Sequence, residues 1–155
     1  MPKRCDHTSV GMFVWKDDKL LMIERGLDPV GFAVPAGHVD DDTTYEAAAI
    51  RELKEEVGLD AQSLELIFEG RKENACRRED GSWHYWKLYR IEAKGELQGD
   101  PLETKRVGCY SREEIKRLAL RTESYLKGEI AEAEWRVRPG LEPVMYEWFS
   151  ALHII

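Results

Sequence analysis

The sequence lacks several features that would point to a membrane or nucleic-acid partner. No apolar run approaches the roughly 20 residues of a membrane span, and the first residues lack the apolar region of a signal peptide. The chain also lacks an excess of positive charge. Its net charge of −7 opposes general affinity for nucleic acid polymers or anionic membranes. Cysteine is scarce: Cys5, Cys76 and Cys109 are an odd number without metal-type spacing. We therefore expect reduced thiols in a cytoplasmic protein.

What is present describes an ordinary globular chain. With 155 residues, 43% hydrophobic and 34% charged, it is long enough to bury a core as one domain. Internal repeats, low-complexity segments and linkers are missing from the sequence. We expect a single domain over residues 1–155, with a C-terminal helical extension from about residue 122.

Residues 37–59, GHVDDDTTYEAAAIRELKEEVGL, hold the most informative pattern. Before them, an apolar stretch is broken by Pro35 and Gly37, which predicts a strand that runs into a tight loop. Thr43 with Glu46 three positions later has the form of a capping box, and Gly58 is well placed to end the helix. Positions 50, 53 and 57 form the expected apolar stripe. The order is therefore strand, loop, helix.

Three carboxylates share one face of this predicted helix. Glu52, Glu55 and Glu56 are three and four positions apart, so their side chains are neighbours. Like charges at that spacing destabilise an isolated helix by roughly 0.2–0.5 kcal/mol a pair. A solvated acidic face would account for the three alone, whereas clustered oxygen ligands are also what Mg²⁺ or Mn²⁺ requires.

The surrounding residues favour the metal interpretation. Gly37, followed by Arg51-Glu52-Leu53-Lys54-Glu55-Glu56-Val57-Gly58-Leu59, resembles the Nudix box, and the flanking strand pattern extends the resemblance from about Ser9 to Leu118. The resemblance implies an α/β (α+β) fold in which a mixed, curved β-sheet is sandwiched between α-helices.

The chain departs from the box at one position. The first glutamate of the family pattern falls at Thr43, and Ala36-Gly37 replaces the usual pair of glycines. In the family that glutamate supports the loop and helix and reaches the metal or the arginine. Arg51 therefore needs another carboxylate, for which the candidates are Asp40, Asp42 and Glu46.

The resemblance assigns roles to the residues that match. It implies that the Gly37 carbonyl, Glu52, Glu55 and Glu56 hold Mg²⁺ or Mn²⁺, and that Arg51 orients the glutamates. The catalytic base is then Glu52 or an acid in the later loop. In that loop Glu103 is the best positional match, with Asp100 behind it, and a loop carboxylate without a role is an equal alternative.

Two further residues are candidates for substrate binding. Arg25 ends the second strand of a predicted hairpin that turns at residues 16–18; a basic residue near this position meets substrate phosphate in many Nudix enzymes. Trp86 lies in a ring-rich strand after a predicted turn at residues 79–82, in a long hairpin from about residue 74. An exposed strand-end arginine and core packing of the ring are the plainer alternatives.

The implied activity is metal-dependent hydrolysis of a diphosphate linkage in a nucleoside-diphosphate-X substrate. Nucleoside triphosphates, ADP-ribose or sugar nucleotides, and dinucleoside polyphosphates all remain open. One alternative is a catalytically weak or inactive nucleotide-binding module, which Thr43 permits. A prenyl-diphosphate isomerase is a further alternative, and it would need Cys76 or Cys109 for proton transfer.

The C-terminal segment has a helical apolar pattern that breaks at Pro139-Gly140. Val144, Trp148 and Ile155 recur on one helical face, with Met145, Phe149 and Leu152 beside them. We expect this stripe to dock on the sheet, with a homodimer interface as the alternative.

Overall fold

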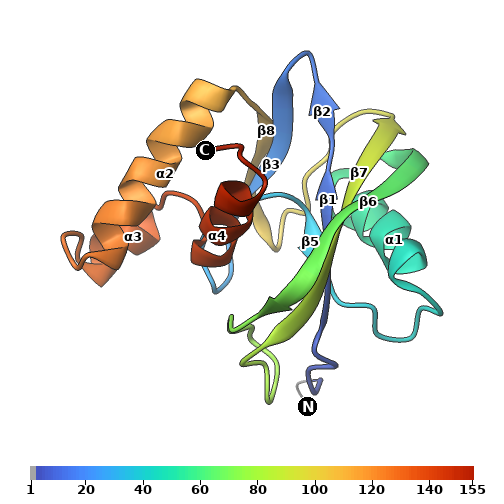
Figure 1. Ribbon diagram of the computed structural model, residues 1–155, viewed down its shortest axis with the longest axis horizontal. Coiled ribbons are helices and arrows are strands. Elements are labelled where there is room, and N and C mark those ends of the chain that lie inside the picture. The colour runs from blue at the N-terminus through green and yellow to red at the C-terminus, as the bar shows by residue number, and fades with distance from the viewer. Residues whose placement is uncertain (1–2) are drawn as a thin grey trace.

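Two four-stranded sheets and four helices make up the computed structural model, which describes residues 3–155 (Figure 1). The first sheet has the order β5-β1-β7-β6; in the second, β3 pairs with β2, β4 and β8. The strands are β1 (Thr8–Phe13), β2 (Trp15–Lys16), β3 (Lys19–Arg25), β4 (Gly31–Ala33), β5 (Ala36–Gly37), β6 (Asp60–Lys72), β7 (His84–Lys94) and β8 (Thr104–Tyr110). The helices are α1 (Tyr45–Val57), α2 (Arg112–Leu126), α3 (Glu132–Val137) and α4 (Pro143–Ala151).

Alternation along the strands explains the layered arrangement. On β1, Val10 and Met12 pack toward α1, whereas Phe13 belongs to the cluster on the other side with the C-terminal helices. The side chains of β7 alternate in the same way. Tyr89 packs in the cluster beside α1, and Leu88 packs in the cluster beside the C-terminal helices. Figure 1 shows α1 on one side of the sheets and α2, α3 and α4 on the other. The expected mixed sheet between helices is therefore confirmed.

Helix α1 begins one residue later than the sequence pattern predicted. Thr44, and not Thr43, is the N-cap, and its hydroxyl accepts a hydrogen bond from the N–H of Ala47 at 3.0 Å. Glu46 does not close a capping box but accepts a hydrogen bond from Tyr89 at 2.9 Å. Gly58 ends the helix as predicted, with a left-handed φ of 76°.

The apolar stripe on α1 also differs from the prediction. Leu53 and Val57 are buried as expected, but Ile50 is 46% exposed. Ala48 and Ala49 occupy the buried face instead. Small side chains let a helix pack close to a sheet. Hydrophobicity alone could not predict that the alanines, and not Ile50, would face the core.

The long hairpin is built differently from the prediction. Strand β6 pairs directly with β7, from Asp60 opposite Lys94 to Lys72 opposite His84. Residues 73–83 are therefore the connecting loop, here called the 73–83 loop, and not the first arm of a hairpin. The predicted turn at residues 79–82 lies at the end of this loop.

The N-terminal segment contacts the 73–83 loop. The N–H of Cys5 donates to the carbonyl of Glu79 at 2.8 Å, and Arg4 forms an isolated bridge with the same residue. The two segments are far apart in the sequence but meet at one end of the molecule, the lower end in Figure 1.

Helices α2, α3 and α4 cover the face of the sheets opposite α1 (Figure 1). Ser111 caps α2 in a capping box with Glu114, as predicted. The extension expected from about residue 122 would begin inside α2, because this helix continues to Leu126. At the predicted break, Gly140 allows close packing, since a Cβ there would lie 2.3 Å from the carbonyl oxygen of Leu118.

The apolar stripe of α4 is occupied by its own chain. Val144, Met145, Trp148 and Phe149 are all at most 3% exposed and belong to the core between the sheets and the C-terminal helices. The expected docking on the sheet is confirmed, and the stripe is not available as a homodimer surface. Over residues 3–155, no helix is both long and apolar enough for a transmembrane span.

The cap of α1 gives a test of this helix start. We expect Thr44→Ala to lower the free energy of unfolding by about 1 kcal/mol, because it removes the partner of an otherwise unpaired helix N–H. Thr43→Ala, the matched control, changes an exposed neighbouring residue and should stay within about 0.5 kcal/mol of the parent protein. Urea unfolding of the two variants measures the difference, and a larger loss from Thr43→Ala would contradict the assignment.

Candidate active site

Three carboxylates on α1 line one wall of a cavity of about 510 Å³. Their exposure differs: the side chain of Glu55 is 59% exposed and that of Glu52 16%, while Glu56 is a buried residue at 7%. A solvated acidic face would leave all three in water. The burial of two of them therefore argues against that interpretation.

Glu56 is held in place by the backbone of the loop before the helix. The N–H of Ala36 donates to its Oε2 at 2.8 Å. Burial raises the pKa of Glu56 well above its ordinary value, and the nearby charge of Glu52 raises it further. A buried carboxylate near a second one is costly unless a proton or a cation neutralises it.

Gly37 allows Glu52 to approach the backbone. A Cβ at this position would lie 2.2 Å from the Cδ of Glu52, so any other residue would displace that carboxylate. Gly37 itself is fixed because β5 pairs with β1, opposite Val10. Burial raises the pKa of Glu52 to about 7, although Arg51 opposes the shift.

Arg51 links the loop to the helix carboxylates. Its Nη1 donates to Glu52 at 2.9 Å and to Glu55 at 3.1 Å, and its Nη2 donates to the carbonyl of His38 at 3.1 Å. Its Nε donates to Asp42 at 2.8 Å. One guanidinium thereby fixes the positions of two glutamates relative to the loop.

Asp42 is the carboxylate that Arg51 required in place of a glutamate at position 43. The other two candidates have different partners: Asp40 forms a two-pronged ion pair with Arg78, at 2.5 and 2.9 Å, and Glu46 accepts from Tyr89. The sequence had named Asp42 as one of three options but could not choose among them, because the choice depends on the path of the loop.

Acidic and basic residues from other segments reach the same cavity. Glu103 and Asp100, from the loop before β8, line it, and Glu103 lies 3.7 Å from Arg77. The basic lining residues are Lys3, Arg25, Arg51, Arg77 and Arg78. A cavity with carboxylates on one wall and cations around it has the charge arrangement for a metal ion with phosphate groups.

Arg25 and Trp86 line the cavity but are engaged with their own chain. The Nε of Arg25 donates to the carbonyl of Pro29 at 2.7 Å and lies 3.2 Å from the buried carboxylate of Glu142. Trp86 is 3% exposed, donates to Asn74 and packs edge-on against Trp148. Its ring therefore belongs to the core, the plainer of the two alternatives.

The donor set fits a hard divalent cation. Glu52, Glu55 and Glu56 offer carboxylate oxygens to this cavity, Gly37 leaves room for Glu52, and Glu56 is buried. Cys109 lies on β8 against the α1-side core, outside this cavity lining.

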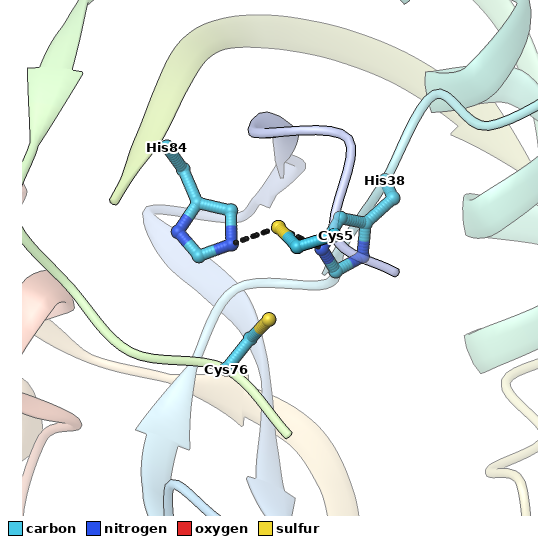
Figure 2. Close-up of side chains that lie close together, drawn as sticks. All are labelled: Cys5, His38, Cys76 and His84. Atoms are coloured by element: carbon cyan, nitrogen blue, oxygen red, sulfur yellow. Dashed lines mark hydrogen bonds between the residues drawn. The ribbon is translucent and has the colours of Figure 1, made fainter. Parts of the chain in front are cut away.

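One group of residues was missed by the sequence reasoning. Cys5, His38, Cys76 and His84 come from four separate segments, and their side chains converge at the edge of the cavity (Figure 2). No spacing rule would have found them, because no two of the four lie close enough in the sequence to form a metal-binding motif.

Comparison with known proteins identifies relatives of this chain. An ADP-ribose pyrophosphatase of Methanocaldococcus jannaschii is 43% identical over 53 residues, which make up 33% of this chain and 31% of that protein. The alignment thus spans less than a third of that relative's length.

Solved structures resemble the fold at low sequence identity. The MutT NUDIX hydrolase from Burkholderia pseudomallei superposes with a TM-score of 0.62 at 22% identity, covering 69% of this chain and 84% of that one. The NUDIX domain of Shewanella oneidensis NrtR, solved in complex with ADP ribose, gives a TM-score of 0.59 at 17% identity, covering 76% and 79%.

The sequence profile of the NUDIX domain matches residues 6–135, most of the chain. This match includes the loop, the helix and the carboxylates of Glu52, Glu55, Glu56 and Glu103. The protein belongs to the Nudix family.

Proposed function

We propose that this protein hydrolyses the diphosphate linkage of a nucleoside-diphosphate-X substrate with the help of Mg²⁺ or Mn²⁺. The observation that carries the proposal is the convergence of Glu52, Glu55 and Glu56 on a cavity that also presents basic side chains. The proposal takes residues 1–155 as one catalytic unit, in which α3 and α4 complete the fold.

The metal ligands in this proposal are the three glutamates and the carbonyl of Gly37. A bound divalent ion supplies charge neutralisation of the diphosphate and lowers the pKa of a coordinated water. Ala36 holds Glu56 through its N–H, and Arg51 sets the positions of Glu52 and Glu55. These contacts prepare the carboxylates before substrate arrives, which reduces the cost of reorganisation.

Two residues are candidates for the catalytic base. Glu52 has a pKa raised to about 7 by burial, close to the range in which a carboxylate accepts a proton from water efficiently. Glu103 reaches the cavity from another loop and is half exposed, with a side chain 49% accessible. It lines the same cavity as the three glutamates of α1, so it can meet a water molecule beside the bound metal.

ADP-ribose is the first substrate to test. The relative from Methanocaldococcus jannaschii is an ADP-ribose pyrophosphatase, and the Shewanella NUDIX domain was solved with ADP ribose. The basic residues around the cavity suit the two phosphates of such a molecule. Sugar nucleotides, nucleoside triphosphates and dinucleoside polyphosphates belong in the same panel.

A nucleotide-binding module without hydrolysis is the second candidate, and Thr43 is the observation that favours it. Asp42 weakens this alternative, because it gives Arg51 the carboxylate that position 43 lacks. The isomerase alternative finds less support, because Cys109 lies outside the cavity lining and the thiol of Cys76 lies within a cluster of cysteines and histidines.

Loss of two of the proposed metal ligands should remove most of the turnover. We expect the Glu55→Gln, Glu56→Gln double variant to lose more than about 100-fold in kcat/KM, since disturbing residues behind metal ligands already costs 10–100-fold. Glu113→Gln, on the exposed side of α2, is the matched control and should retain full activity. Phosphate-product release from the substrate panel with Mg²⁺ or Mn²⁺ is the measurement.

Three outcomes separate the candidates. Metal-dependent turnover that disappears in the double variant supports the hydrolase and names its substrate class. Nucleotide binding with no turnover across the panel would favour the binding module. Turnover that survives in the double variant would refute the assignment of these glutamates.

The raised pKa values predict a pH dependence of stability without metal. Between the ordinary value of 4.5 and about 7, folded Glu52 keeps a proton that the unfolded chain releases, so the free energy of unfolding should fall as pH rises through this window. Glu56, whose pKa is also raised, acts in the same direction. The slope is at most about 1.4 kcal/mol per pH unit for each group.

Urea unfolding in EDTA from pH 5 to pH 8 measures this effect. Glu52→Gln should flatten the decline, because it removes one titrating group. Added Mg²⁺ should restore stability most at high pH, where the carboxylates are ionised. A stability that rises with pH in EDTA, equally in both proteins, would contradict the raised pKa of Glu52.

A further inference from the structure

Two thiols and two imidazoles converge beside the active site (Figure 2). Cys5 comes from the segment before β1, His38 from the loop after β5, Cys76 from the 73–83 loop and His84 from the first position of β7. One ligand atom from each lies within 4.8 Å of the other three. The Sγ of Cys5 is 3.3 Å from the Nε2 of His84 and 3.6 Å from that of His38.

These separations are close to those of a tetrahedral zinc site. Bonds of about 2.3 Å to sulfur and about 2.0 Å to nitrogen place neighbouring sulfur and nitrogen ligands about 3.5 Å apart. The two measured sulfur–nitrogen distances lie on either side of that value. Side-chain shifts of about 1 Å would close the remaining gaps around one ion.

Contacts behind the ligands orient them as in metal sites. The Nδ1 of His84 lies 3.0 Å from the carbonyl oxygen of Asn74, which can only accept, so Nδ1 carries the proton and Nε2 presents its lone pair to the cluster. The backbone N–H of His7 donates to the Sγ of Cys5 at 3.3 Å, which would stabilise a thiolate there. Such outer contacts are typical of built metal sites.

The donor set and its burial select the metal. Cys5 is 5% exposed and His84 2%. Thiolate sulfur and imidazole nitrogen are ligands for Zn²⁺, whereas Mg²⁺ and Mn²⁺ take carboxylate oxygens such as those of α1. Four protein ligands fill the coordination of zinc and leave no position for a substrate, which is the arrangement of a structural site.

We propose that Cys5, His38, Cys76 and His84 bind one Zn²⁺ in a closed tetrahedral site that is separate from the catalytic metal site. On binding, both thiols lose their protons to solvent, so that two thiolates neutralise the charge of the ion. The oxidation state of the metal and of the sulfurs does not change.

The consequence is a further cross-link between segments that hydrogen bonds and ion pairs already join, such as Cys5 with Glu79 and Arg78 with Asp40. The ion would join the N-terminal segment and the 73–83 loop to residues 38–44, the loop that follows Gly37. His38 follows Gly37 directly, and its carbonyl accepts from Arg51. Zinc would therefore hold the first residue of the loop that Arg51 also contacts.

The 73–83 loop is shaped to present its cysteine. The N–H of Cys76 donates to the carbonyl of Gly81 at 2.8 Å, which closes a turn. A Cβ at position 81 would lie 2.2 Å from the Sγ of Cys76, so the glycine leaves room for the sulfur. Arg78 from the same loop is paired with Asp40, which anchors the turn to residues 38–44, the loop before α1.

Zinc content of the purified full-length chain tests the proposal. Protein produced with added zinc and dialysed without chelator should retain about one zinc per chain, measured by mass spectrometry of the elements. The Cys5→Ser, Cys76→Ser double variant should retain less than about a tenth of that, because two of the four ligands are removed. Cys109→Ser is the matched control and should keep the full amount.

A cobalt titration of the unaltered protein covers the case in which the double variant fails to fold. Co²⁺ should give the visible bands of a tetrahedral ion and a thiolate-to-cobalt charge-transfer band, and added Zn²⁺ should remove both. Octahedral bands alone would place the ion on the carboxylates and overturn the proposal. So would zinc that is retained by a folded double variant, or a Cys5–Cys76 disulfide found by mass spectrometry in zinc-supplied, reduced protein.

The zinc site and the proposed hydrolase can fail independently. The Glu55→Gln, Glu56→Gln variant should lose turnover but keep its zinc. If that variant lost zinc in proportion to turnover, the ion would belong to the glutamates and the four-residue site would be refuted.

Discussion

The hydrogen bond from the Ala36 N–H to the buried carboxylate of Glu56 is the contact on which the site depends. It joins β5, just before the loop, to the last of the three glutamates on the acidic face of α1. Glu56 is buried, so its partners cannot be replaced by water, and the loop and the helix must stay in register for the carboxylate to be satisfied. The close approach of Glu52 to Gly37 follows from the same register.

The guanidinium of Arg51 offsets the repulsion between the carboxylates that surround it. It contacts Asp42, Glu52 and Glu55 together with a backbone carbonyl, and so compensates for the threonine at position 43. The departure from the family pattern is thus local. Asp42, one residue before position 43, reaches the same guanidinium, because both positions lie in the loop before the helix begins at Tyr45.

The sequence predicted those parts of the molecule that depend on neighbouring residues. The helix end at Gly58, the capping box at Ser111 and the shared face of the three glutamates follow from spacing along one segment. What the sequence could not provide depends on tertiary contacts: the N-cap at Thr44, the exposed Ile50 and the direct pairing of β6 with β7. The cluster of Cys5, His38, Cys76 and His84 is the extreme case, since its members come from segments that only the pairing of β5, β1, β7 and β6 brings together.

The parallel pairing of β1 with β7 has a consequence for synthesis on the ribosome. Thr8 lies opposite Tyr85, so β1 cannot pair with β7 until about 80 further residues have been synthesised. Strand β3 and its partner β8 are separated in the same way. Until then the apolar residues of β1 and β3 lack their final partners, and non-local pairing of this kind slows folding and exposes strand edges to association. The emerging chain is therefore most prone to association before its last third has left the ribosome, when the apolar surface open to chaperones is largest.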